Sequence, residues 1–428
     1  MFDSTTIAVT IFVIAYVLII SEKVHRTIVG IVGAMLMIIF GILSQETAIH
    51  HIDFNTLGLL MGMMIIVNIT AETGVFNYMA IWAAQKVKAN PMKLLLALAT
   101  LTAVCSALLD NVTTVLLTVP VTFSITSQLK VDVKPFLMAQ ILASNIGGTA
   151  TLVGDPPNIM IGSSVGLSFM DFIMNLTLPA IVIFIVTVFI LEALYGKSLH
   201  TTPELQAQVM KLNPAKQIAD KGLLKRCLFV LALTMSLFVA HSALGLESAT
   251  AAMTGAGLLL LLTYTRDEEM IAKVLSKIEW LAIFFFAGLF ILVGALVETG
   301  VIKMLAAEAV ALTQGSVEAT AILILWMSAI ASAFIDNIPF VATMIPLIKD
   351  MGQMGLSNLE PMWWSLALGA CLGGNGTLIG ASANVVVASL AAQHGRQISF
   401  IGFMKVAFPC MILSIILSTA YVYLRYLM

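Results

Sequence analysis

Long hydrophobic runs fill most of this sequence, and short polar stretches separate them. Runs such as residues 7–20, 178–191 and 408–424 approach or reach the roughly 20 residues that a helix needs to cross the hydrocarbon core of a bilayer. Prolines and glycines interrupt several runs, and a bilayer tolerates a broken helix only where protein or a water-filled cavity covers the freed backbone. The pattern predicts an all-α polytopic membrane protein with broken helices, an arrangement typical of transport.

Composition narrows the function classes further. The 428 residues are 60% hydrophobic and 10% charged, whereas a soluble domain is about 45–50% apolar and about 25% charged. This excludes a water-soluble enzyme, and we expect no catalytic residue, cofactor or bound metal, because no phosphate loop, nucleophile motif or ligand spacing occurs. The net charge of −2 without a basic stripe excludes a nucleic-acid partner. Residues 1–6 carry no basic region, so we interpret the first apolar run as a span and not a signal peptide.

The chain repeats itself internally, as a search for self-similarity reveals. Three motifs recur 226 positions further on: residues 106–111 (SALLDN) as 332–337 (SAFIDN), residues 147–154 (GGTATLVG) as 373–380 (GGNGTLIG), and residues 72–75 (ETGV) as 298–301 (ETGV). Because all three keep the same register, we interpret the chain as a duplicated half. The predicted units are a first repeat (1–196), a polar linker (197–226) and a second repeat (227–428).

Loop charges indicate how the two repeats are oriented. Residues 22–26 carry Lys23 and Arg26, whereas the matching loop, 245–249, has no Lys or Arg. The next pair reverses this, since residues 44–55 have none and residues 265–278 have three. Lys and Arg favour the cytoplasmic side, so equivalent loops lie on opposite sides of the membrane. The prediction is two inverted repeats of five crossings each, with the N-terminus outside and the linker cytoplasmic.

Each repeat is expected to contain a re-entrant hairpin and a broken helix. For the first repeat, the expected elements are spans 5–21 and 27–43, a long segment 56–85 interrupted near 72–74, a hairpin 94–127 with its tip at Asp110 and Asn111, a broken span 136–165 and a closing span 172–195. The second hairpin is expected at 320–355.

The hairpin tips are the sharpest candidates for chemistry. Inverted repeats with discontinuous helices commonly place transport sites near the bilayer midplane. An ionisable group at that depth costs about 2.5–3.5 kcal/mol and needs compensation, so Asp110, Asn111, Asp336 and Asn337 are predicted to bind a coupling ion, H⁺ or Na⁺. The alternative is that each Asp-Asn pair only caps the half-helix that follows it.

The broken spans supply the other candidates. Prolines and clustered glycines prevent a regular helix there, so carbonyls, hydroxyls and amides are expected to face a solute. The predicted substrate-binding residues are Asn145, Gly147, Thr149, Thr151, Asp155, Asn158, Gly373, Asn375, Thr377 and Asn384. Asp155 is matched by Ala381, so any role of Asp155 is not symmetric. The alternative is a kink packed against small residues of a neighbouring helix.

The remaining ionisable candidates are Glu72 and Glu298, which sit at interruptions and are considered accessory. His50 and His51 are interpreted as a solvated loop pair. Every ionisable side chain in the candidate core is then acidic, which suits protons, metal cations or a neutral polyhydroxy solute better than a carboxylate.

These residues resemble the ion transporter superfamily over nearly the whole chain. Asp110-Asn111 and Asp336-Asn337 are similar to the hairpin motif that reads Ser-Asn-Thr in its sodium/dicarboxylate symporters, and residues 147–158 are similar to its most recognisable signature. With Asp in the hairpin, the chain most resembles the branch with citrate-transporter-like domains that holds arsenite permeases, silicic-acid effluxers, sodium/proton antiporters and the P protein. The resemblance implies a homodimer with a static scaffold and a moving transport domain, an elevator mechanism.

The function expected from these observations is proton-coupled antiport that exports a small inorganic solute, such as arsenite or silicic acid, across a cell membrane, in bacteria the inner one. Asp110 and Asp336 would alternately bind the coupling ion. The alternatives are a sodium/proton antiporter, a sodium-coupled di- or tricarboxylate symporter and, in another class, a passive anion channel. The expected partners are the solute, the ion, lipid and a second copy of the chain.

Overall fold

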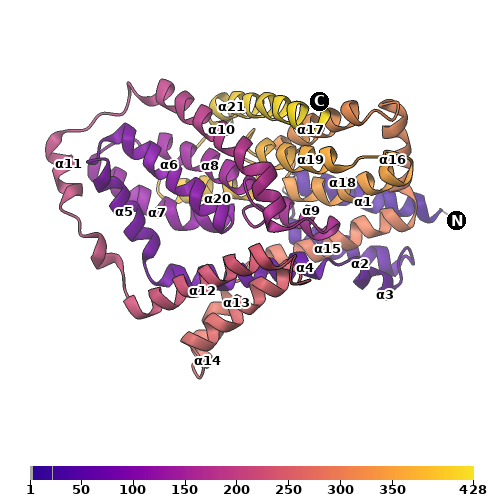
Figure 1. Cartoon of the computed structure of the whole chain (residues 1–428), viewed down its shortest axis with the longest axis horizontal. Coiled ribbons are helices and arrows are strands. Elements are labelled where there is room, and N and C mark those ends of the chain that lie inside the picture. Colours follow the sequence, from indigo (N-terminus) through magenta and orange to yellow (C-terminus); the bar gives the residue numbers. More distant parts are fainter. Residues whose placement is uncertain (1–2, 22) are drawn as a thin grey trace.

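The two halves of the chain correspond helix by helix (Figure 1). The computed structural model describes residues 3–21 and 23–428, in which all regular secondary structure is helical. The pairs are α1 (Ser4–Ser21) with α12 (Lys221–Ala240), α2 (Arg26–Ile39) with α13 (Ser248–Thr263), α3 (Gln45–His50) with α14 (Glu268–Ser276), α4 (Phe54–Glu72) with α15 (Trp280–Glu298), α5 (Val75–Lys86) with α16 (Val301–Leu312), α6 (Pro91–Leu108) with α17 (Val317–Phe334), α7 (Asn111–Leu129) with α18 (Asn337–Gln353), α8 (Lys134–Thr149) with α19 (Glu360–Gly373), α9 (Pro156–Val165) with α20 (Ser382–Gln393), and α10 (Phe169–Tyr195) with α21 (Phe400–Val422).

The expected elements are present at nearly the expected places. From α4 to α9, each helix begins 226 residues before its counterpart. The linker holds α11 (Pro203–Met210) and a short 3₁₀ turn (Pro214–Gln217). One boundary differs, because α12 already begins at Lys221, before the expected end of the linker at residue 226. Asp220 caps the first turn of α12 by accepting hydrogen bonds from two backbone amides.

Local chemistry explains where the long segments break. Gly74 and Gly300 adopt left-handed conformations, with φ of +79° and +77°, and separate α4 from α5 and α15 from α16. Asp110 and Asp336 cap α7 and α18, which fixes the two hairpin tips. Pro156 occupies the first position of α9, where a missing N–H costs nothing.

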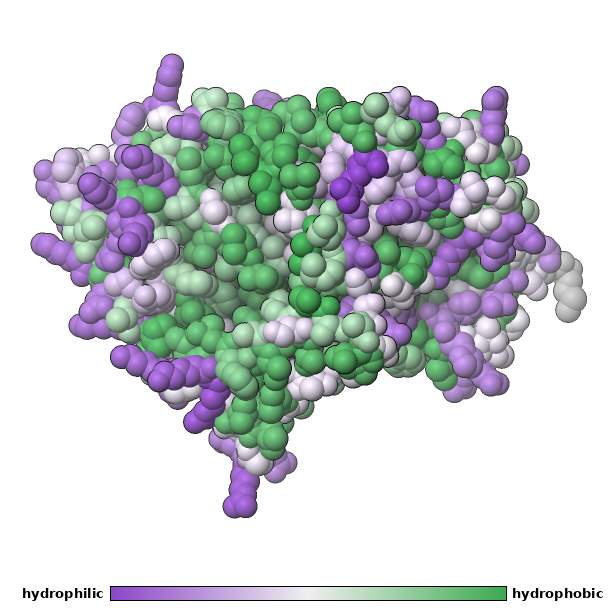
Figure 2. Space-filling view, in the orientation of Figure 1, coloured by the Kyte–Doolittle hydropathy of each residue, from purple (hydrophilic) through white to green (hydrophobic). Residues whose placement is uncertain are grey.

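Nine helices in the described residues are long and apolar enough to cross a membrane: α1, α4, α6, α7, α10, α12, α15, α17 and α21. This set differs from the expected crossings because three of the four hairpin limbs qualify, whereas α2, α13 and the pieces of each broken helix are too short. In Figure 2, hydrophilic residues gather toward the two ends of the long axis and hydrophobic residues cover most of the face between them. The predicted fold class, an all-helical membrane protein of two repeats, is confirmed.

The two halves exchange packing partners around the centre of the molecule. Within each half, the first hairpin limb packs on the first piece of the broken helix, α6 on α8 and α17 on α19. Across the halves, α7 packs on α20 and α18 packs on α9. Each hairpin therefore packs against both broken helices. The two breaks and the two hairpin tips lie together at the centre of the molecule.

Glycine makes the closest of these approaches possible. A Cβ on Gly147 of α8 would lie 2.2 Å from the carbonyl oxygen of Ala103 in α6, and a Cβ on Gly373 of α19 would lie 2.5 Å from that of Ala329 in α17. Both distances are too short for any side chain, and backbone cannot move aside without shifting the helix. The equivalence of the two contacts shows that both halves use the same packing.

We therefore expect Gly147→Ala and Gly373→Ala each to lower stability by about 1–3 kcal/mol, the usual cost of overpacking a core. The measurement is thermal stability of the purified protein in detergent by size-exclusion chromatography. Gly257→Ala is the matched control, because nothing lies within 4 Å of its Cβ position and alanine is the better helix former. Equal melting temperatures for all three variants would contradict the packing described here.

Candidate functional site

Both hairpin tips are capped by their aspartates. Asp110 Oδ1 accepts a hydrogen bond of 2.8 Å from the backbone amide of Thr113, and Asp336 Oδ1 accepts one of 3.1 Å from that of Ile338. The capping interpretation is therefore correct in geometry for both residues. It occupies one oxygen of each carboxylate and leaves the second oxygen available for another partner.

An amide network joins the first hairpin tip to both breaks. Asn145 accepts a hydrogen bond of 3.3 Å from Asn111 and donates bonds of 2.9 Å to the side-chain oxygens of Asn375 and Asn384. Asn145 and Asn384 have no exposed surface, and the other two are almost fully buried. The network spans both halves, so it couples the positions of the two broken helices and the first hairpin.

Most of the other predicted substrate ligands hold the unwound backbone. Asn158 donates to the carbonyls of Gly148, Thr149 and Thr151, and Asn384 donates to those of Gly374 and Thr377. The hydroxyls of Thr151 and Thr377 donate, at 2.5 Å each, to carbonyls at the ends of α6 and α17. Thr149 donates to the carbonyl of Asn145. These groups satisfy polar atoms that the breaks expose, and Gly147 and Gly373 provide the close packing described above.

A small buried cavity remains at the point where the tips meet the start of α9. Its volume is about 40 Å³, enough for a small ion or water, and its lining includes Asp110, Asn111, Asp155 and Asn337. Asp155 is 1% exposed and accepts a hydrogen bond of 3.5 Å from Asn337 through Oδ1. Asp155 Oδ2 and Asn111 Oδ1 are buried without a hydrogen-bond partner. Buried polar atoms normally have partners, so these two oxygens mark the cavity as the candidate binding site.

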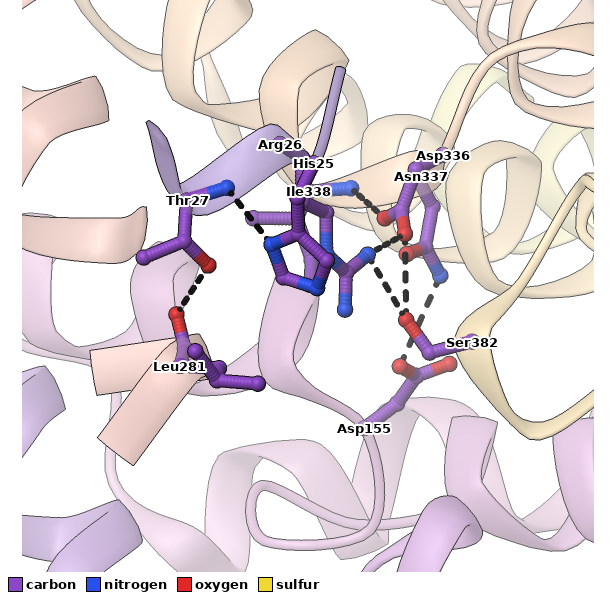
Figure 3. Close-up of polar contacts among 9 residues, drawn as sticks. All are labelled: His25, Arg26, Thr27, Asp155, Leu281, Asp336, Asn337, Ile338 and Ser382. Atoms are coloured by element: carbon purple, nitrogen blue, oxygen red, sulfur yellow. Dashed lines mark hydrogen bonds and ion pairs between the residues drawn. The ribbon is translucent and has the colours of Figure 1, made fainter. Parts of the chain in front are cut away.

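A basic residue also reaches this region, which corrects the expectation that every core ionisable group is acidic. Arg26 Nη1 forms an ion pair with Asp336 Oδ2 and donates a hydrogen bond of 3.0 Å to Ser382 (Figure 3). The hydroxyl of Ser382 in turn donates to Asp336 Oδ2 at 3.0 Å. In the sequence Arg26 stands out only as a loop charge. In the structure it is the first residue of the short α2, and the packing of α2 on α15 brings it to the second hairpin.

Glu279 is a second residue that the sequence analysis missed. It lines the small cavity together with Asp110, and also a larger vestibule of about 390 Å³ that includes Arg26 and Asp336. Glu279 directly precedes α15 and corresponds in the repeat to Asp53, which directly precedes α4. An acidic residue at the equivalent position of the first half, Asp53, was the feature of the sequence that pointed to Glu279.

The accessory candidates lie away from the cavity. Glu72 forms ion pairs with Lys277 at 2.8 Å and Lys273 at 3.4 Å. Glu298 pairs with His51 at 3.1 Å, and its side chain is 48% exposed. His51 is thus the partner of a carboxylate rather than half of an isolated histidine pair. Neither glutamate lines the cavity between the hairpin tips.

Comparisons with known proteins place this arrangement in a family. A family model described as a citrate transporter matches residues 16–369, most of the chain. The chain belongs to this citrate transporter family. The predicted resemblance to the ion transporter superfamily is thereby confirmed, and the chain is a multi-pass membrane transporter.

Similar proteins support the assignment to the citrate transporter family along the whole length. An uncharacterized transporter of Mycobacterium tuberculosis is 45% identical over 429 residues, 99% of both chains. The 46 kDa membrane protein of Mycobacterium leprae is 42% identical over the same length. The P protein of Mus musculus is 34% identical over 98% of this chain, which spans 60% of the P protein.

Two solved transporters share the fold of this member of the citrate transporter family. The YdaH transporter of Alcanivorax borkumensis aligns with a TM-score of 0.60 at 12% identity, over 94% of this chain and 99% of its own. MtrF of Neisseria gonorrhoeae aligns with a TM-score of 0.58 at 10% identity, over 91% and 84% respectively. At these identities the likeness concerns architecture alone.

The amide network yields a stability prediction. Asn145→Ala removes the donor to Asn375 and Asn384, and each buried oxygen left without a partner costs about 1–3 kcal/mol. We expect a clearly lower melting temperature in detergent than for wild type. Asn68→Ala is the control, because the exposed bond of Asn68 to the Lys277 carbonyl contributes little, within about 0.5 kcal/mol. Comparable losses in both variants would show that the network does not hold the breaks together.

Proposed function

We propose that this transporter is a proton-coupled antiporter that exports a small neutral hydroxylated solute, such as arsenite or silicic acid. One observation carries the proposal: both hairpin tips meet the start of α9 at a buried cavity that holds two unpartnered oxygens, Asp155 Oδ2 and Asn111 Oδ1. A static scaffold would gain nothing from such a cavity, because unsatisfied buried oxygens reduce stability. A bound cation or hydroxyl donor would satisfy them.

The chemistry of the cavity explains how exchange would work. An ionised carboxylate only accepts hydrogen bonds, whereas a protonated one donates through its O–H. A solute with several hydroxyls can donate to ionised Asp155 or Asp110, and protonation of the same carboxylate turns one acceptor oxygen into a donor, which weakens that binding. Proton and solute then compete for one group, and competition for one site is what antiport requires. The cavity volume of about 40 Å³ fits an ion or a water molecule, so a hydroxylated solute would extend from the carboxylates into the adjoining vestibule of about 390 Å³.

A second candidate follows from Arg26. The guanidinium lies on the wall of the vestibule of about 390 Å³, and a planar guanidinium binds carboxylates in a fork geometry. The description of the matching family names citrate. Cation-coupled transport of a di- or tricarboxylate is therefore the alternative, with Arg26 as the anion ligand after it leaves Asp336.

The test is transport in proteoliposomes with arsenite, silicic acid, sodium and citrate as solutes and with the pH and sodium gradients varied independently. We expect accumulation of a neutral hydroxylated solute against its gradient when an opposing proton gradient is imposed. Asp110→Asn and Asp155→Asn should lower coupled transport at least about tenfold, the effect of losing about 1.4 kcal/mol of binding to the carboxylate. The control is Asp267→Asn, which alters an exposed cap of α14.

Three results would contradict the antiport proposal. Citrate uptake driven by a cation gradient would favour the symport alternative. Flux that never exceeds equilibrium would indicate a channel. Full coupling in both carboxylate variants would remove the cavity from the mechanism.

We also propose that the N-terminus lies outside and that the linker is cytoplasmic, as the loop charges predict. In a background without the four native cysteines, Gln208→Cys in the linker should react with a membrane-impermeant thiol reagent only after the cells are opened. Gln314→Cys, between α16 and α17, should react in intact cells. Both positions are exposed. The opposite pattern would reverse the assigned orientation.

A further inference from the structure

The internal repeat places two equivalent carboxylates at the two hairpin tips, but their electrostatic surroundings differ. Asp336 has a counter-charge from the chain itself, the guanidinium of Arg26. In the described residues, no basic side chain forms an ion pair with Asp110. The Asp-Asn sequence is the same at both tips, but only Asp336 has a cation of the chain beside it. In the described residues, Asp110 is the tip carboxylate that a mobile cation would neutralise.

Several contacts hold Arg26 in place beside Asp336. The guanidinium also bonds Ser382 at the start of α20 and lies 5.2 Å from the ring centroid of Phe285, a cation–π contact. The next residue, Thr27, donates a hydrogen bond of 2.7 Å to the carbonyl of Leu281 in α15, and His25 accepts the backbone amide of Thr27 (Figure 3). The arginine is thus tethered at both its backbone and its head group.

In the described part of the chain, no equivalent cation is paired with the aspartate of the first tip. The helix that corresponds to α2 is α13, which begins with Ser248, and the neighbouring Ala249 amide donates to Asn55. Near Asp110 the structure instead offers Asp155, whose second oxygen is unpartnered, together with Asn111. The cavity at the first tip is therefore lined by three carboxylates, those of Asp110, Asp155 and Glu279, and by an orphaned amide oxygen. The guanidinium of Arg26 also reaches its wall, but it is paired with Asp336 at the second tip.

We propose that Arg26 is a built-in cation that occupies the second of two pseudo-equivalent cation sites, so that only one mobile coupling cation binds per cycle, between Asp110 and Asp155. This inference rests on the proposed cation coupling and specifies its stoichiometry. It replaces the expectation that Asp110 and Asp336 alternately bind the coupling ion.

The variant that tests it follows from the cost of an unpaired charge. The ion pair is partly buried, since the side chain of Asp336 is 12% exposed and that of Arg26 is 30% exposed. Removal of one partner leaves the charge of Asp336 uncompensated, so Arg26→Gln should favour uptake of a proton or Na⁺ by Asp336. The ionisable groups that face this region are His25, Glu279, Asp110 and Asp155. Arg26→Lys keeps the charge and should preserve the single site.

The experiment is infrared difference spectroscopy of the full-length protein in phosphatidylethanolamine/phosphatidylglycerol vesicles, with two probes and no solute: a fall in pH, and addition of Na⁺ at constant pH. In wild type we expect carboxyl signals that Asp110→Asn or Asp155→Asn removes and that Asp336→Asn leaves unchanged. Arg26→Gln should add one further carboxyl signal. The double variant Arg26→Gln with Asp336→Asn should lose that additional signal. Because both side chains are then neutral, the double variant should also keep the fold if Arg26→Gln alone is unstable.

The control is Arg226→Gln, an exposed arginine of α12 that bonds only the Leu262 carbonyl, which should add no signal. A wild-type signal that disappears with Asp336→Asn, or an Arg26→Gln protein without an additional signal, would overturn the proposal, as would a wild type that responds to neither probe. Because no solute is present, these outcomes are separate from the transport assays, in which the antiport function itself succeeds or fails.

Discussion

The structure depends on one constraint: at the centre of a bilayer, each backbone group that a broken helix frees must find a partner inside the protein. Asn158 and Asn384 provide those partners, because each donates to carbonyls of its own break. The hydroxyls of Thr151 and Thr377 then fasten the breaks to the hairpins. The signature motifs of this chain are thus first a solution to a hydrogen-bonding problem. The polar groups that do not bond the freed backbone remain available for binding.

The charged groups near the breaks and hairpin tips do not follow the symmetry of the repeat. Duplication produced two hairpins, two breaks and two tip aspartates, and the packing of α7 on α20 and α18 on α9 preserves the exchange between the halves. Charge departs from that symmetry at two positions: Arg26 faces Asp336, and Asp155 has Ala381 as its counterpart. Glu279 also joins Asp110 at the cavity, although its counterpart Asp53 is acidic as well. Two repeats with the same fold can therefore carry different charges, and the proposed single cation site lies at only one of the two hairpin tips.

The sequence predicted the helices, the interruptions and the tips because each has a local cause. Gly74 permits a left-handed turn, Pro156 begins a helix, and Asp110 caps one, and these causes act over a few residues. Partner choice across the chain has no such local signal. Arg26 and Asp336 are separated by 310 positions, and a basic residue next to a span is typical of a cytoplasmic loop. Thr149 and Asn158 likewise carried polar groups whose partners were not visible in the sequence.

By itself, then, the sequence determined the class of protein and the duplication, and its loop charges predicted the opposite orientation of the two repeats. Hydropathy, repeat register and loop charge are properties of the chain that packing does not alter. Only the tertiary structure decided which polar groups bind backbone and which face a cavity. That decision depends on which helices approach one another, and the close contacts of Gly147 with Ala103 and of Gly373 with Ala329 set those approaches. A buried carboxylate is a candidate binding group when its neighbours leave one of its oxygens without a partner, as they do for Asp155.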